Sequence, residues 1–271
     1  MRAAVPGAAL GAAATGEGGA ARPLGRGALR FLSVATVLGL WELAGRGGVN
    51  PALPAFSETA LAGLAMLADG SLPRAFLVTL EPLALGLLLS TVLGVGLGVA
   101  MGLSRTAEWL GVPVLVVLQA APLAALVPLF TFAYGIGLVS KTLVVCVMAL
   151  PVIVLNAYRA IRHTPRSLVE MGQVFLASRT GIVLRILLPA ASPVIFAGLR
   201  LGVAAGFIGA VLAELLITPT GIGDLVTYHQ SIADYPRMYA AIAAIVLASV
   251  LTIGLLERVE VRLFRPERAG R

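Results

Sequence analysis

The sequence predicts an all-α polytopic membrane protein with six transmembrane helices and both termini in the cytoplasm. The chain has 271 residues, of which 59% are hydrophobic and only 12% are charged. A soluble domain of this length would carry more charge. Several charge-free stretches are long enough, as helices, to cross a hydrocarbon core of about 30 Å. The cations also gather on one side of these stretches, which is typical of inner-membrane proteins.

The chain begins with residues 1–27, which are rich in alanine and glycine and which we expect to be disordered. Their apolar stretch is interrupted by Glu17 and Pro23 and does not have the pattern of a signal peptide. The domain organisation expected after them is a transmembrane domain over residues 28–260 and a basic cytoplasmic tail over residues 261–271.

The first span is expected over residues 28–45, and a short amphipathic helix capped by Ser57 is expected over residues 57–68. The second span covers residues 81–103. Glycines recur at intervals of four along it, and such a smooth helix face lets another helix approach closely. These glycines are Gly94, Gly98 and Gly102.

The next apolar stretch contains three prolines and is too long for one upright helix, so we expect a third span over residues 112–134 with irregular ends. A glycine turn leads to the fourth span, in which Pro151 is expected to produce a kink. The remaining spans are expected over residues 142–158, 193–217 and 238–256. An external loop over residues 218–237 separates the last two.

The orientation follows from the cations. Fifteen of the 20 arginines and lysines fall on the side of the termini, four fall on the other side, and Arg200 lies in or at the edge of the fifth span. Because positive residues resist translocation, the side with fifteen is expected to be cytoplasmic. Residues 159–188, between the fourth and fifth spans, therefore face the cytoplasm.

The 159–188 segment is polar enough to lie in water, yet it has the pattern of helix. Thr164-Pro165 is a helix-start signal, and Ser178 can cap a second short helix. Three apolar residues at helical spacing give the first helix an apolar stripe: Leu168, Met171 and Phe175. Such a helix can dock on a soluble partner, or it can lie among lipid head groups.

Sites for other chemistry are few. Residues 135–142 nearly match a phosphate-binding loop, but Ser140 stands where the loop requires glycine, so we do not expect nucleotide binding. The single cysteine, Cys146, excludes a disulfide within the chain. Acidic residues and the two histidines do not cluster, and no soluble domain carries the basic residues. We therefore expect no metal, no cofactor, no nucleic-acid partner and no enzymatic activity.

Two charged residues of the fifth span have alternative interpretations. Glu214 either reaches head-group water at the end of the span or is a buried functional acid. Arg200 either extends to the cytoplasmic surface or pairs with a carboxylate. Neutral polar residues of the spans could line a path for a polar solute, or could bond helices to one another. The candidates for such a path are Gln119, Thr131 and Asn156.

The sequence Glu170-Met171-Gly172, followed by Ile186-x-Leu188-Pro189, resembles the EAA loop in the permeases of bacterial ABC importers. The glutamate and the Ile-x-Leu-Pro residues align with the family pattern without a gap. Met171 and Gly172 replace alanines of that pattern, and Leu176 replaces a glycine that is thought to let the chain turn. Ala177-Ser178 could supply the break instead.

The resemblance covers about residues 75–265 and points to the sulfonate, taurine and nitrate branch of the family. It implies the fold of a type I ABC importer permease. It also implies that residues 135–142, which nearly match a phosphate-binding loop, are a turn common to this family. The similar stretches are 121–129, 134–141, 198–200, and Glu214 through 221–223.

The resemblance also implies the partners and the mechanism. Two permeases would form a homodimer in the lipid of the bacterial inner membrane, with a separate cytoplasmic ATPase subunit and an extracytoplasmic solute-binding protein. The 159–188 segment would couple the permease to the ATPase as a rigid lever and is called the coupling segment below. Its coupling residues would be Ser167, Leu168, Glu170, Met171, Gly172, Phe175, Leu176, Ile186, Leu188 and Pro189.

The expected cargo is a small polar solute such as a sulfonate, taurine or nitrate. An ion-coupled secondary transporter or channel is the alternative, because Glu214 is an acid in or near the membrane. Such carriers usually need several membrane acids, and this sequence has few. A membrane-embedded enzyme is disfavoured because titratable residues do not cluster.

Overall fold

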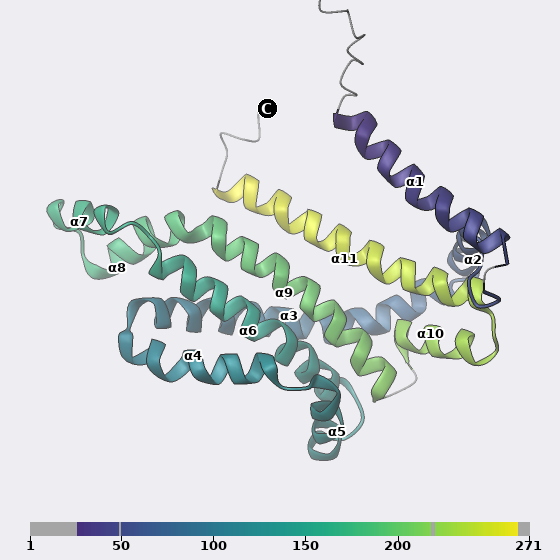
Figure 1. Cartoon of the computed structure of the whole chain (residues 1–271). Helices are drawn as coiled ribbons and strands as arrows, with labels where there is room; N and C mark the ends of the chain where they lie inside the picture. Colours follow the sequence, from purple (N-terminus) through teal and green to yellow (C-terminus); the bar gives the residue numbers. More distant parts are fainter. Residues whose placement is uncertain (1–25, 49, 218–219, 265–271) are drawn as a thin grey trace, which may run out of the picture.

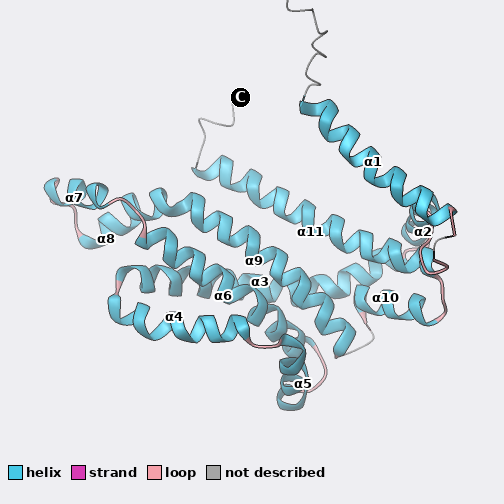
Figure 2. Ribbon diagram, in the orientation of Figure 1, coloured by secondary structure: helices cyan, strands magenta, loops and turns pink. Residues whose placement is uncertain are grey.

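The computed structural model describes residues 26–48, 50–217 and 220–264, and every regular element in these residues is helical (Figure 2). The prediction of an all-α fold is confirmed. The expected disorder of residues 1–27 falls largely on residues 1–25, outside the described part, and residues 26 and 27 already belong to a helix. The expected basic tail is helical to residue 264, and the rest of it also lies outside the described part.

The helices follow one another with short connections (Figure 1). They are α1 (Arg26–Arg46), α2 (Phe56–Ala68), α3 (Ser71–Leu103), α4 (Arg105–Ala120), α5 (Leu123–Tyr134), α6 (Leu138–Arg162), α7 (Arg166–Val174), α8 (Arg179–Ile182), a π-helical turn (Val183–Leu187), α9 (Leu188–Leu216), α10 (Gly221–Ser231) and α11 (Tyr235–Phe264).

Four stretches of the described residues are long and apolar enough to cross a membrane. They lie in α3, in α6, in the run from α8 through α9, and in α11, and α4 with α5 makes a fifth if the pair counts as one span. The predicted number of six is therefore not confirmed. The expected first span corresponds to α1, which is helical over 21 residues but is not among these stretches.

The expected third span is broken in its middle, not only irregular at its ends. Its two halves, α4 and α5, meet at an angle of 104°. Pro122 lies at the break, and the residue before it, Ala121, is extended with φ −64° and ψ 133°. A proline disfavours the helical conformation of the preceding residue, so α4 ends there.

The core of the bundle is α6, which packs between α3 and α9 (Figure 1). The predicted glycine face of α3 lies against α6. A Cβ atom on Gly94 would lie 2.8 Å from Ile153, and one on Gly102 would lie 2.6 Å from Ile161. The same Ile153 also meets α9, since a Cβ on Gly202 would lie 2.4 Å from it. The absence of side chains at these glycines lets the three helices approach closely.

The bundle has two distinct ends (Figure 1). At one end lie α7, α8 and the turn between α3 and α4, and at the opposite end lie α2 and α10. The prediction that residues 218–237 form a loop was wrong, because eleven of these residues form the helix α10.

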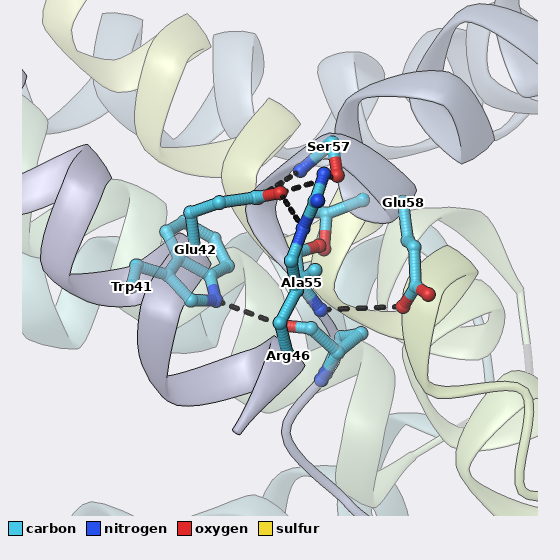
Figure 3. Close-up of polar contacts among 8 residues, drawn as sticks. Trp41, Glu42, Arg46, Ala55, Ser57 and Glu58 are labelled. Atoms are coloured by element: carbon cyan, nitrogen blue, oxygen red, sulfur yellow. Dashed lines mark hydrogen bonds and ion pairs between the residues drawn. The ribbon is translucent and has the colours of Figure 1, made fainter. Parts of the chain in front are cut away.

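At the end with α2, the carboxylate of Glu42 ties α1 to α2 (Figure 3). It accepts hydrogen bonds from both the backbone N–H and the hydroxyl of Ser57, each at 2.8 Å. Ser57 therefore does not cap α2 as expected. The preceding turn is closed by Ala55, whose N–H donates to Glu58 at 3.2 Å. The indole N–H of Trp41 donates to the Pro54 carbonyl and completes the junction.

Candidate functional site

The coupling segment folds as a helical hairpin at one end of the bundle. α6 ends at Arg162, and α7 begins four residues later at Arg166. The expected cap at Thr164 does not form, because its hydroxyl donates backward to the Ala160 carbonyl at 2.9 Å. The expected cap at Ser178 is confirmed, since its side chain accepts the Gly181 N–H at 3.1 Å and starts α8.

Gly172 lies where α7 packs against α8 and the π-helical turn. It is buried, and a Cβ on it would lie 2.7 Å from Cδ1 of Ile186 and 3.1 Å from Cγ1 of Ile182. An alanine at this position would have to push Ile186 aside. This contact gives a physical reason for the glycine where the EAA pattern has alanine, and it fixes α7 to the helix that continues into α9.

Leu176 makes the turn between the two arms of the hairpin. Its φ is +53°, in the left-handed region that glycine adopts without cost. The turn is closed by hydrogen bonds from the N–H of Leu176 to Gln173 and from the N–H of Ala177 to Gly172, at 2.9 and 3.0 Å. The break therefore lies at Leu176 itself, the position of the family glycine, and not at Ala177-Ser178.

Leu176→Gly is expected to stabilise this turn. A non-glycine residue in the left-handed conformation costs about 1–2 kcal/mol, and glycine removes that cost. Because the Leu176 side chain is 93% exposed, its loss removes little packing. Hydrogen exchange of the amides of residues 174–178 should slow in the variant. Leu184→Gly, at an exposed residue of the π-helical turn, is the control and should speed local exchange. Faster exchange in Leu176→Gly would contradict the turn geometry.

The tip of the hairpin exposes an apolar surface. Val174 and Phe175 are each 78% exposed, and Met171 and Leu176 are exposed beside them. Ser167 and Glu170 are also exposed, whereas Leu168 is half-buried. The exposed apolar surface therefore differs from the expected stripe. Leu168, which the stripe included, is half-buried, whereas Val174 and Leu176, which it did not include, are exposed.

The second arm joins the membrane bundle without a break. In the π-helical turn the N–H of Leu188 donates to the carbonyl of Val183, five residues earlier. Pro189 follows directly and has no N–H to donate, and such wide turns relieve a local mismatch in a helix. Ile186 and Leu188 pack against the core cluster that contains Ile182 and Leu187, so the arm and α9 are one continuous body.

At the opposite end of the bundle, Glu214 is buried, with 2% of its surface exposed. Its carboxylate accepts the hydroxyl of Thr79 at 3.0 Å and the N–H of Gly223 at 2.9 Å. The Thr79 oxygen in turn accepts the N–H of Ile222 at 3.0 Å. The interpretation of Glu214 as a residue in head-group water is therefore wrong: the carboxylate joins α3, α9 and the first turn of α10, where an anion is favoured. Thr79 was missed because it lies 135 residues away in the sequence.

Lys141 lies close to this carboxylate. It is buried, and its Nζ donates to the hydroxyl of Thr220 at 2.6 Å. The residues that nearly match a phosphate-binding loop turn into α6, and the Ser140 hydroxyl donates to the Gly135 carbonyl at 2.5 Å. The lysine is thus directed toward the chain before α10 and not toward a phosphate in the loop.

The far end of α10 is fixed around His229, which is buried. Its Nδ1 lies 3.5 Å from the carboxylate of Asp234. Burial lowers the pKa of His229 below its usual value, and the negative charge of Asp234 offsets part of that effect.

Arg200 pairs with the carboxylate of Glu260 on α11. Of the two interpretations of Arg200, the structure supports the partner to a carboxylate. The pair ties the last turns of α11 to the middle of α9.

The three residues proposed for a solute path lie on three different helices, α4, α5 and α6. Gln119 is exposed, and the hydroxyl of Thr131 donates to the carbonyl of Val127 on its own helix. The side chain of Asn156 faces α9, where a Cβ on Gly198 would lie 2.4 Å from it. At 1.5 Å per residue, Gln119 lies about 21 Å from the start of α4 and Asn156 about 9 Å from the end of α6. Their role in a path stays a prediction.

Comparison with known proteins gives one family. A family model described as "Binding-protein-dependent transport system inner membrane component" matches residues 90–265. The riboflavin transport system permease protein RibX of Chloroflexus aurantiacus is 37% identical over 55% of this chain and 57% of its own length. The putative aliphatic sulfonates transport permease protein SsuC of Bacillus subtilis is 29% identical over 84% of each chain. The taurine transport system permease protein TauC of Escherichia coli is 29% identical over 72% of this chain and 71% of its own.

A solved structure of the MetNI methionine ABC transporter in an inward-facing conformation has a similar fold. The TM-score is 0.53 at 20% identity, over 69% of this chain and 92% of the other. At this identity the similarity concerns the fold alone.

Proposed function

This chain belongs to the family of binding-protein-dependent transport system inner membrane components, the permease subunits of ABC importers, and from this premise we propose that it carries a small polar solute inward using ATP hydrolysed by a separate subunit. The relatives are named as permeases and not as enzymes. The family and the apolar helices of the chain make it a multi-pass protein of the inner membrane.

The observation that supports this function is the exposed tip of the coupling segment. Val174 and Phe175, at the end of α7, are each 78% exposed, while Gly172 holds α7 against Ile182 and Ile186. An exposed apolar surface on a rigid support is the form expected of a docking element. We propose that it inserts into a cleft of the cytoplasmic ATPase. The continuous second arm would then pass the displacement to α9.

The two ends of the bundle suit two different partners. The coupling segment would face the cytoplasm, where ATP is available. The end formed by α2 and α10 would face outward and receive the solute from an extracytoplasmic binding protein. We propose a homodimer of permeases around the path, in membrane lipid, as the family resemblance implies. For the solute we propose a sulfonate or taurine, because the relatives SsuC and TauC align over 84% and 72% of this chain. Nitrate, which the family resemblance suggests, and riboflavin, after the shorter match to RibX, are further candidates.

The function is tested by reversing the charge or polarity of the docking surface. Glu170→Arg and Phe175→Glu alter two exposed residues, so the permease itself should fold normally. Each variant is expected to lose at least tenfold in the amount of ATPase subunit that co-purifies with it, since a misplaced charge at the centre of an interface costs about 2 kcal/mol or more.

The control is Gln230→Arg, an exposed residue of α10 at the opposite end. It should retain the ATPase subunit in full. Normal retention in both Glu170→Arg and Phe175→Glu would show that the ATPase does not bind at α7.

A further inference from the structure

Glu108, near the start of α4, ties this helix to the end of α6. Its carboxylate accepts the hydroxyl of Tyr158 at 2.6 Å and lies 3.4 Å from the guanidinium of Arg162. Tyr158 and Arg162 are four residues apart on α6, so they stand on the same face of that helix. One carboxylate on α4 therefore engages two successive turns of α6.

This contact lies where α6 leads into the coupling segment. Arg162 is the last residue of α6, and α7 begins at Arg166. The start of α4 is at the same end of the bundle as α7 and α8 (Figure 1). A displacement of the coupling segment is therefore transmitted to Glu108 through the last two turns of α6.

The rest of α4 is held by apolar contacts only on its inner face. Leu115 is buried in a cluster with Met101 of α3 and Val154 and Leu155 of α6. The outer face is exposed, as at Trp109 and Val117. Apolar packing has no preferred direction along the helix, whereas a charge-assisted hydrogen bond fixes both distance and direction.

We propose that the Glu108 carboxylate is a positioning group of the transport cycle, which makes α4, and α5 beyond the bend, follow α6 when the coupling segment is displaced. The inference rests on the proposed function, because the displacement comes from the ATPase subunit. Movement of the coupling segment would then reach the membrane helices by two routes. One is the continuous second arm into α9, and the other is the contact of Glu108 with α6, which leads to the α4–α5 pair.

A glutamate in the first turn of α4 also has a local role. The positive end of the helix dipole favours an anion there, and the hydroxyl of Ser104 accepts the N–H of Ala107 to close the same turn. That role requires no partner on α6. Removing Tyr158 or Arg162 therefore separates the two roles, since it leaves the glutamate in the first turn and cuts its link to α6.

The test follows α4 and the coupling segment separately. The permease with Cys146→Ala is purified with its ATPase subunit and labelled with bimane at Val117→Cys on α4 or at Leu184→Cys in the coupling segment, both exposed positions. Fluorescence is recorded before and after addition of MgATP and vanadate. In the otherwise unchanged chain, both labels should respond.

In Glu108→Ala, the Leu184 label should respond as before, and the response of the Val117 label should fall by about twofold or more. Tyr158→Phe and Arg162→Gln each remove one contact and should reduce only the Val117 response. Glu42→Ala is the matched control, because Glu42 ties α1 to α2 at the opposite end (Figure 3). It should leave both responses unchanged.

An undiminished Val117 response in Glu108→Ala would overturn the proposal. If Glu108→Ala fails to assemble, the proposal is decided by Tyr158→Phe and Arg162→Gln, and undiminished Val117 responses in these two would overturn it equally. If the Leu184 label fails to respond in the unaltered complex, the proposed function is wrong, independently of Glu108.

Discussion

Replacing Gly98 with alanine is expected to destabilise the permease by about 1–3 kcal/mol, although it adds a single methyl group. The new Cβ would lie 2.5 Å from Cβ of Ala157, 2.7 Å from the carbonyl oxygen of Val154 and 2.9 Å from the backbone N of Tyr158. Two of these three atoms belong to the backbone of α6 and the third is an alanine Cβ fixed by that backbone, so none of them can rotate away. The helices α3 and α6 would have to separate, which would loosen the centre of the bundle.

The measurement is the midpoint of thermal unfolding of the purified permease in detergent. Gly96→Ala is the matched control, because Gly96 lies two residues earlier on the same helix, is exposed and has no heavy atom within 4 Å of its ideal Cβ. That substitution should be neutral or stabilising by up to about 1 kcal/mol, the difference in helix propensity. Equal midpoints for the two variants would refute the close packing of α3 on α6.

That one face of α3 allows close packing of another helix could be predicted, because its signal is local and periodic, whereas the identity of the partner, α6, could not. Gly94, Gly98 and Gly102 lie four apart, so they must share one face of a helix whatever the fold is. The position of the coupling segment in the sequence could likewise be predicted, because its polar residues interrupt the apolar stretches. The same spacing of four recurs in α9, where Gly198 and Gly202 lie against Asn156 and Ile153 of α6 and Gly206 lies against Leu87 of α3, so this second contact face carried the same signal.

Features that depend on distant partners could not be predicted. Two interpretations of Glu214 were open from the sequence, head-group water at the end of the span or a buried acid, and no residue near it in the sequence could decide between them. Its burial depends on Thr79 in α3 and on the chain reversal that returns Gly223 to the same carboxylate. The tie between Glu108 and Tyr158 is of the same kind, since the two residues lie 50 positions apart.

Local signals failed where two of them competed. The apolar residues of 112–134 favoured one span, but Pro122 acts on the preceding residue and divides it. Leu176 is the reverse case. A leucine gives no sequence signal for a turn, and only the family pattern marks the position, yet hydrogen bonds on both sides hold it at a positive φ.

The joint around Glu214 leads to the second large effect, expected for Gly221→Ala. Gly221 has a φ of +78°, and a Cβ on it would lie 2.1 Å from Oε1 of Glu214 and 2.7 Å from Oγ1 of Thr79. The left-handed conformation alone costs an alanine about 1–2 kcal/mol. The clash adds a further cost, because Glu214 can move only by giving up its hydrogen bonds to Thr79 and Gly223, and an unpaired buried carboxylate is strongly unfavourable.

Gly70→Ala separates the two costs. Gly70 has a nearly identical φ of +78°, and the nearest atom to its Cβ is 3.6 Å away on the flexible side chain of Arg74. It should therefore show the conformational cost alone. In the purified permease, Gly221→Ala should lower the unfolding midpoint more than Gly70→Ala and should speed hydrogen exchange throughout α10. If the two variants behave alike, the carboxylate of Glu214 does not hold the first turn of α10, and that end of the bundle is fixed by apolar packing.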